Sequence, residues 1–158
     1  MIPRIELMTN KSFIGIRRIM SLKENETHLL WKTFMPLRKE IKNVLDSNLY
    51  SIQIYGSQYF QHFNPNNQFE KWAAVEVSDL NSIPINLESL TIPGGMYAVF
   101  HYKGLSTDTA IFEYIFNTWL PNSEYGLDDR PYFEILGERY KNNAPDSEEE
   151  IWIPIKNK

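Results

Sequence analysis

The sequence predicts an α+β fold made of two tandem strand-helix-strand-strand modules with pseudo-two-fold symmetry. Segments rich in β-forming residues are interrupted by two stretches with helical apolar spacing, and this order occurs in both halves of the chain. The chain has 158 residues, the size of one ordinary domain or two small fused modules. We expect a single domain over residues 1–158, with module one at about 3–78 and module two at about 88–157.

The first module opens with two short strands, predicted over residues 3–8 and 11–20. A helix is predicted from about residue 24 to residue 45. Its apolar residues are spaced by three and four positions, which places them on one face: Leu30, Phe34, Leu37, Ile41 and Val44. Pro36 lies inside this pattern and should kink or split the helix.

Two more strands complete this module, at residues 50–56 and 69–77. The polar, asparagine-rich residues 57–67 between them predict a loop. A linker containing Pro84 then leads into the second module.

The second module repeats this order. A strand is predicted at residues 95–102 and a helix from about residue 107 to residue 120. Ser106 is the expected N-cap, Asp108 lies in the first turn, and Pro121 should end the helix. The apolar residues of this helix form one broad stripe: Ile111, Phe112, Ile115, Phe116, Trp119 and Leu120.

The chain ends with two further predicted strands. The first, at residues 131–137, carries Glu134, and a polar turn at residues 142–149 leads to the second, at residues 150–155. Pro154 predicts that this last strand lies at a sheet edge, because proline cannot donate a ladder hydrogen bond.

The two halves also align in sequence. Residues 51–56 match residues 132–137 at an offset of 81 residues, which makes Gln53 equivalent to Glu134. Chance similarity between two amphipathic strands would give the same match. Pseudo-two-fold symmetry would instead place the modules side by side in an antiparallel sheet, with a concave ligand cleft between them and the helices packed on the sheet.

Glu134 is the most unusual residue of these strands. Strand interiors disfavour glutamate, and an apolar face makes an unpaired carboxylate costly. Alternation places Tyr132, Glu134 and Leu136 on one face, which either meets solvent or lines an aromatic site. A carboxylate among aromatic rings can bind an organic cation or move a proton.

The composition limits the possible functions. Hydrophobic residues make up 42% of the chain and aromatic residues 14%, enough for a core and for a pocket lined with rings. The net charge of −4 argues against a protein that grips phosphate backbones. The chain has no cysteine, and His28, His62 and His101 show no metal-ligand spacing, so neither a metal nor another cofactor is expected. We find no signal peptide and no membrane-spanning run, which predicts a cytoplasmic protein without membrane contact.

Several segments together carry a family resemblance that covers nearly the whole chain: residues 69–77, 92–100, 119–121, 130–134 and 148–155. With the doubled element order, they resemble the gyrase-inhibitor-like (GyrI-like) family of small-molecule-binding domains. The same domain forms the effector-binding half of AraC-type and multidrug-sensing regulators of transcription. Those regulators carry a helix-turn-helix domain before this module, whereas here the module starts within the first residues. We therefore expect a stand-alone member without direct nucleic-acid binding.

The resemblance implies a concave, aromatic-lined pocket at the junction of the modules, with a buried glutamate that pairs with cationic, lipophilic ligands. Glu134 takes that position. The remaining pocket walls are implied by the resemblance at Leu136, Glu150, Trp152, Tyr55, Trp72 and Trp31.

Some of these side chains have an alternative role in the core. Trp72 and Trp152 fit either the pocket or the core, whereas Trp119 fits the core. Tyr97 could donate a hydrogen bond to Glu134 or to a ligand, or simply pack in the core. Glu150 shares a face with Trp152, and the rest of the acidic run at residues 146–149 is expected to be solvated.

Three functions remain open from the sequence. The first is a small-molecule-binding protein for lipophilic, cationic ligands that uses Glu134 as the charge partner. The second is a hydrolase of strained, cyclopropane-bearing electrophiles, as in some stand-alone GyrI-like proteins, with Glu134 as general acid or base. The third is docking to gyrase, to a regulator or to another protein partner.

Overall fold

The structure, a computed structural model, describes residues 1–158. Its first half contains four strands and one helix: β1 (Arg4–Met8), β2 (Lys11–Ser21), α1 (Thr27–Leu37), β3 (Leu49–Ile54) and β4 (Gln68–Val77). Its second half has the same order with one additional short strand, β7, after a helical region in three short segments: β5 (Glu88–Ile92), β6 (Gly95–Lys103), α2 (Ala110–Tyr114), η2 (Ile115–Trp119), α3 (Leu120–Asn122), β7 (Tyr125–Leu127), β8 (Tyr132–Leu136) and β9 (Glu148–Asn157).

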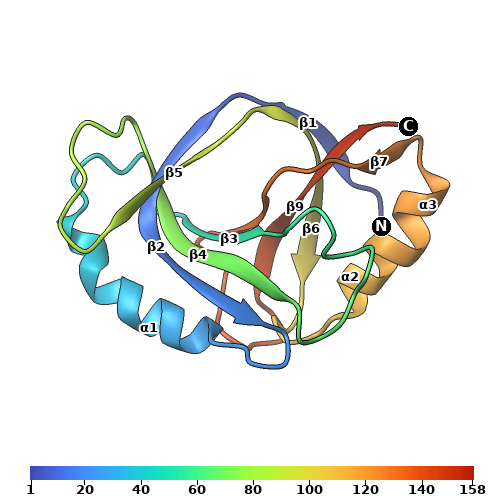
Figure 1. Ribbon diagram of the computed structural model, residues 1–158, viewed down its shortest axis with the longest axis horizontal. Helices are drawn as coiled ribbons and strands as arrows, with labels where there is room; N and C mark the ends of the chain where they lie inside the picture. The colour runs from blue at the N-terminus through green and yellow to red at the C-terminus, as the bar shows by residue number, and fades with distance from the viewer.

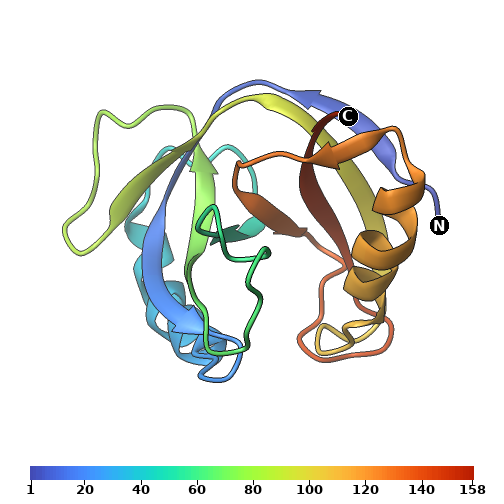
Figure 2. The same ribbon diagram turned by 45° about the vertical axis from the view of Figure 1, so that its right-hand side comes forward.

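The strands form one antiparallel sheet in the order β1-β6-β9-β8-β3-β4-β2-β5, and β7 pairs with β9. The two middle strands, β3 and β8, come from different halves of the chain. Figures 1 and 2 show α1 at one side of the molecule and the α2–α3 region at the other, with the sheet between them. The fold is therefore the predicted α+β arrangement of an antiparallel sheet with helices on it.

The two ends of this sheet are covalently joined. Only residues 9–10 separate β1 from β2, and only residues 93–94 separate β5 from β6. Met8 pairs with Gly95 and Lys11 pairs with Ile92, so a single register continues across both turns. The sheet consequently closes on itself, and the arch over the top of Figure 2 is this long ribbon of β1–β2 against β5–β6.

Pairing around β3 and β8 repeats between the two halves. Ile52 of β3 pairs with Trp72 of β4, and Phe133 of β8 pairs with Trp152 of β9. Ile52 and Phe133 also pair directly with each other. The sequence offset of 81 residues relates these same two residues.

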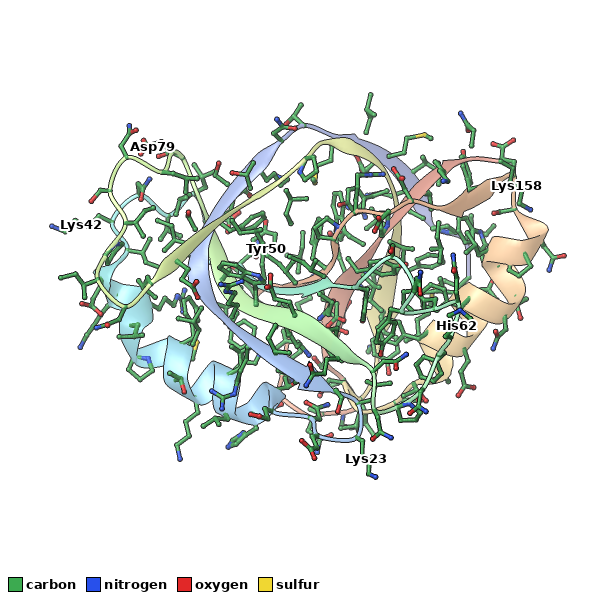
Figure 3. All side chains as sticks on the ribbon, viewed as in Figure 1. Lys23, Lys42, Tyr50, His62, Asp79 and Lys158 are labelled. Carbon is green, nitrogen blue, oxygen red and sulfur yellow. The ribbon has the colours of Figure 1, made fainter.

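Three buried clusters fill the fold. One lies on the inner face of the closed sheet and contains aromatic rings from several strands: Phe13, Tyr50, Trp72, Tyr97, Phe133 and Trp152. Tyr50 lies at the middle of the view in Figure 3, whereas the labelled Lys42 and Lys158 lie at the periphery. The other two clusters lie under the helices, one with Leu30 of α1 and one with Ile115 of η2.

Both helices differ from the sequence prediction in their bounds. The helix expected over residues 24–45 ends one residue after Pro36, where the missing N–H weakens the last turn, and only a 3₁₀ turn at Arg38–Glu40 follows. The second helical region begins at Ala110 rather than near residue 107, with Thr109 and not Ser106 at the N-cap position. Pro121 does not end it, because the last segment, Leu120–Asn122, contains Pro121 in its first turn, where a proline is tolerated. Neither helix is long and apolar enough to cross a membrane.

Three strand predictions also need correction. β5 was expected to be linker and β7 to be loop, so the second module has a leading strand like the first. β9 begins at Glu148 and lies between β6 and β8 rather than at an edge. Pro154 is tolerated there because it falls between the stretches that pair with β8 and with β7, where its carbonyl accepts the Asp128 N–H at 3.1 Å.

Candidate ligand-binding site

A pocket of about 340 Å³ opens on the helix-bearing face of the sheet, within the size range of small-molecule sites. Its floor comes from β3, β4, β8 and β9, and its walls come from the loop after β3, the helical region after β6 and the connection before α1. Hydrophobic residues make up 13 of its 20 lining residues, so the pocket is mainly apolar. Most of the lining rings belong to eight residues: Tyr55, Tyr59, Phe60, Phe63, Phe69, Phe112, Phe116 and Tyr132.

A second hollow, of about 460 Å³, lies along residues 56–68. It is shallow and open to solvent, and only one of its seven lining residues is hydrophobic. Its shape and polarity suit bound water rather than an organic ligand, so the apolar pocket is the better candidate despite its smaller volume.

Tyr55 stands at the centre of the aromatic wall. Its ring lies 4.6 Å from that of Tyr59, 5.0 Å from that of Phe60 and 5.1 Å from that of Tyr132, between ring centroids. Burial raises the pKa of the phenols of Tyr55 and Tyr132, which keeps both neutral. The wall therefore offers ring faces and edges without adding charge.

Three charged side chains reach this aromatic pocket from different strands: Lys71 from β4, Glu134 from β8 and Glu149 from the start of β9. The strand register explains why they meet. Gln53 of β3 pairs with Lys71 on one side and with Tyr132 on the other, and Glu134 pairs with Ile151. Paired residues point to the same face of a sheet, and so do alternate residues along a strand.

Glu134 is half-buried and lines the pocket. This burial raises the pKa of its carboxyl, and the positive charge of Lys71 acts in the opposite direction. Ser51 is its cross-strand partner on β3, and the Ser51 hydroxyl accepts a hydrogen bond from Gln53 Nε2 at 3.0 Å. The structure contains no salt bridge from Glu134, so its carboxylate is available to a ligand.

Lys71 is held on the β4 side of the pocket floor. Its Nζ donates a hydrogen bond to Thr27 Oγ1 at the start of α1, at 3.0 Å. Burial lowers the pKa of Lys71, whereas the negative charges of Glu134 and Glu149 raise it. No nitrogen–oxygen contact within 4.0 Å joins Lys71 to either carboxylate.

Glu149 is a second acidic group in the same pocket. Burial, and then the neighbouring charge of Glu134, raise its pKa to about 8, while Lys71 acts to lower it. Two carboxyl groups and one ammonium group thus share one apolar space. Such a cluster can accept a cation, or exchange a proton with a bound molecule near neutral pH.

Four of the residues expected at the site line this pocket: Tyr55, Tyr132, Glu134 and Trp152. Trp152 needs a qualification. Its cross-strand partner is Phe133, and its ring belongs to the inner cluster, so the indole lies on the face of the sheet behind the pocket floor.

The other five expected residues lie elsewhere: Leu136, Glu150, Trp72, Trp31 and Tyr97. Trp72 and Tyr97 belong to the inner cluster, because their strand positions point to the opposite face. The Tyr97 hydroxyl donates to the Pro131 carbonyl at 2.9 Å, and not to Glu134.

The remaining three are separated from the pocket in different ways. Glu150 alternates with Glu149 and therefore points away, where it pairs with Arg4 at 3.0 Å. Trp31 packs beside Phe34 under α1, and Leu136 lies two residues beyond Glu134 at the end of β8.

The sequence prediction missed Lys71, Glu149 and all the phenylalanines of the pocket. Glu149 lies in an acidic run that was expected to be solvated, yet its side chain is buried. The alternation of Phe69, Lys71 and Ala73 in β4 was the available signal, because it places a charge in the middle of an apolar strand face. No group of three or more histidine, aspartate or glutamate side chains converges in a way that could hold a metal ion.

Comparison with known proteins defines the class. The chain belongs to the family described as "Cass2: Integron-associated effector binding protein", which it matches over residues 4–155. This agrees with the effector-binding fold that the sequence resemblance predicts.

One relative among the curated proteins is a transcriptional regulator. The transcriptional regulator BrlR of Pseudomonas aeruginosa is 28% identical over 148 residues, which is 91% of this chain and 52% of BrlR. The chain therefore spans about half the length of this curated relative. SAV2435, solved bound to tetraphenylphosphonium, has a similar fold, with a TM-score of 0.72, 15% identity, and coverage of 99% of this chain and 94% of that one.

A protein from Listeria innocua shares the fold as well. Its solved structure is described as a hydrolase encoded by lin2189, with a TM-score of 0.64, 9% identity, and coverage of 98% of this chain and 92% of that one. At these identities the two solved structures establish a shared fold, and the function has to be argued from the pocket itself.

Proposed function

We propose that this protein binds lipophilic organic cations in the aromatic pocket, with Glu134 as the charge partner. The observation that carries the proposal is the carboxylate of Glu134, which lies in an apolar, ring-lined space without a salt bridge. Burial without a partner makes this carboxylate costly in the empty protein. A cation that carries its own apolar surface offsets that cost by ion pairing and by contact with the ring faces.

The size and lining of the pocket support this class of ligand. A volume of about 340 Å³ accommodates a small multi-ring molecule, and the aromatic wall around Tyr55 offers few directional polar contacts. Selection would therefore depend on charge and apolar shape more than on hydrogen-bond pattern. SAV2435, which has this fold, was solved with tetraphenylphosphonium, a cation of this chemical kind.

Hydrolysis of a strained electrophile would use the same carboxyl group as general acid or base. No observation in this pocket favours that reaction over binding. The two functions separate by turnover, because a binder holds one equivalent of a compound and an enzyme consumes many.

The test is a calorimetric titration of tetraphenylphosphonium into the wild type and Glu134→Gln, with neutral triphenylphosphine oxide as the matched ligand. We expect the cation to bind the wild type and to bind Glu134→Gln at least about tenfold more weakly, since the variant keeps the shape and loses the charge. The neutral compound should bind both proteins equally weakly.

Glu150→Gln is the matched control, because Glu150 is the adjacent carboxylate on β9 and lies outside the pocket. It should bind the cation as the wild type does. Equal binding of the cation by the wild type and Glu134→Gln would overturn the proposed role of Glu134.

A further inference from the structure

The charges around the pocket are few and can all be named. Of its lining residues, Lys71, Glu134 and Glu149 can carry charge near neutral pH. The remaining titratable lining groups are phenols: Tyr55, Tyr59 and Tyr132. The phenol of Tyr140, in the loop before β9, also senses both carboxylates. Burial raises the pKa of all four phenols, so they stay neutral.

The ammonium and the carboxylates come from different strands of the pocket floor. Lys71 projects from β4 and is tied to Thr27 of α1, whereas Glu134 and Glu149 project from β8 and β9. β3 separates β4 from β8 in the sheet. Lys71 thus compensates the negative charge of the pocket without a direct ion pair to either carboxylate, so both carboxylates remain available to a ligand.

We propose that Lys71 is the internal counter-ion of the pocket and limits its ligands to a single positive charge. This inference rests on the proposed cation-binding function. With both carboxylates ionised, Lys71 balances one of them and leaves one negative charge for the ligand. A second positive charge on a ligand would be buried opposite the Lys71 ammonium without a carboxylate to balance it, and such a charge is costly in an apolar site.

The experiment compares two ligands of nearly the same shape that differ by one charge. N-methyl-4-phenylpyridinium is a flat monocation, and N,N′-dimethyl-4,4′-bipyridinium is the corresponding dication. Both are titrated by calorimetry at pH 8.5, above the pKa of about 8 of Glu149, into the wild type, Lys71→Met and Lys71→Arg. Methionine preserves much of the length of the lysine side chain and removes the charge, while arginine preserves the charge.

We expect the wild type to bind the monocation at least about tenfold more tightly than the dication, a difference of roughly 1.4 kcal/mol. Lys71→Met should reduce this preference by about tenfold, mainly by tightening dication binding. Lys71→Arg should retain the preference of the wild type. Circular dichroism and a thermal melt check that each variant is folded.

Glu149→Gln tests the same charge balance by removing a negative charge instead of the positive charge of Lys71. Its result does not depend on whether Lys71→Met folds. With one carboxylate removed, Lys71 balances Glu134 alone, and monocation binding should weaken by about tenfold.

Two results would overturn the inference about Lys71 while leaving cation binding intact. One is a wild type that binds the dication as tightly as the monocation. The other is a Lys71→Met variant that binds the monocation but keeps the preference of the wild type. A wild type that binds neither cation would overturn the proposed function, and this inference with it.

Discussion

The rings of Phe133 and Trp152 stack with their centroids 5.1 Å apart on the face of the sheet opposite Glu134. The ring of Tyr97 completes the group, 5.3 Å from Phe133 and 5.7 Å from Trp152. This stack joins β8 to β9 directly behind the pocket. It therefore fixes the spacing of the two strands that present Glu134 and Glu149, although the rings themselves do not face the ligand.

Replacing Trp152 should consequently affect stability more than binding. The side chain is only 8% exposed, and Trp152→Ala should lower the free energy of unfolding by about 3–5 kcal/mol through lost packing. Trp152→Phe should cost less and leave the affinity for tetraphenylphosphonium within about twofold, since the indole lies on the inner face. Urea unfolding and calorimetry measure the two effects. If Trp152→Phe weakened binding severalfold at unchanged stability, the indole would have to reach the pocket.

Phe60 should show the opposite behaviour. Its ring is 43% exposed in the loop after β3 and stacks on Tyr132 at 5.8 Å on the rim of the pocket. Phe60→Ala should weaken cation binding by about tenfold, by removing a ring face and apolar contact, and should change stability by less than about 1 kcal/mol. Ile85→Ala is the control, because Ile85 is also exposed and lies outside the pocket. Equal effects of the two variants on affinity would rule out Phe60 as a ligand contact.

The order of strands and helices, and the importance of Glu134, could be predicted from the sequence for simple physical reasons. Strand and helix periodicities differ, and a carboxylate in a run of strand-forming residues is costly enough to stand out. The relation between the halves also had a sequence signal, the offset that aligns Ile52 with Phe133. The structure adds that these two residues pair with each other.

The other pocket residues depend on information that no local pattern contains. Periodicity assigns Trp72 and Lys71 to opposite faces of β4, but both faces of this closed sheet are covered. The ribbon of β1–β2 paired with β5–β6 closes the sheet around one face, which becomes the inner core. The pocket therefore lies on the other face. The resemblance implied Trp72 and Trp152 at the pocket, whereas their rings lie in the inner core and the pocket is lined mainly by tyrosine and phenylalanine.

The turn between β5 and β6 gives a prediction about stability alone. Gly95 has φ +154°, and an added Cβ would lie 2.5 Å from the Arg130 guanidinium. That guanidinium is fixed by Asp128 at 2.7 Å and by the Met96 carbonyl at 2.6 Å, so it cannot withdraw easily. Gly95→Ala should therefore lower the free energy of unfolding by about 2 kcal/mol or more.

Gly126→Ala is the matched control for Gly95→Ala in a urea titration. An added Cβ at Gly126 meets nothing within 4 Å, and its φ is not in the left-handed region. This variant should differ from the wild type by less than about 1 kcal/mol. Equal stability of the two alanine variants would show that Arg130 moves aside at little cost.

The raised pKa of Glu149 predicts how stability depends on pH in the empty protein. The unfolded chain loses this proton near the ordinary value of 4.5, whereas the folded protein keeps it until about pH 8. Between these values the folded state binds more protons than the unfolded state, so the free energy of unfolding must fall as pH rises. We expect Glu149 to lower the free energy of unfolding by about 2 kcal/mol between pH 5 and pH 8. This is less than the whole difference between its folded and unfolded pKa would give, because water in the pocket screens the charge.

Urea unfolding at intervals from pH 5 to pH 8 measures this dependence in the wild type, Glu149→Gln and Glu150→Gln. Glu149→Gln should lose most of the decrease, and the remainder belongs to Glu134, whose pKa burial also raises. Glu150→Gln should keep the dependence of the wild type, because Glu150 lies outside the pocket. A wild type whose stability rises over this interval would mean that Glu149 is ionised in the empty pocket, with Lys71 close enough to act as a direct partner.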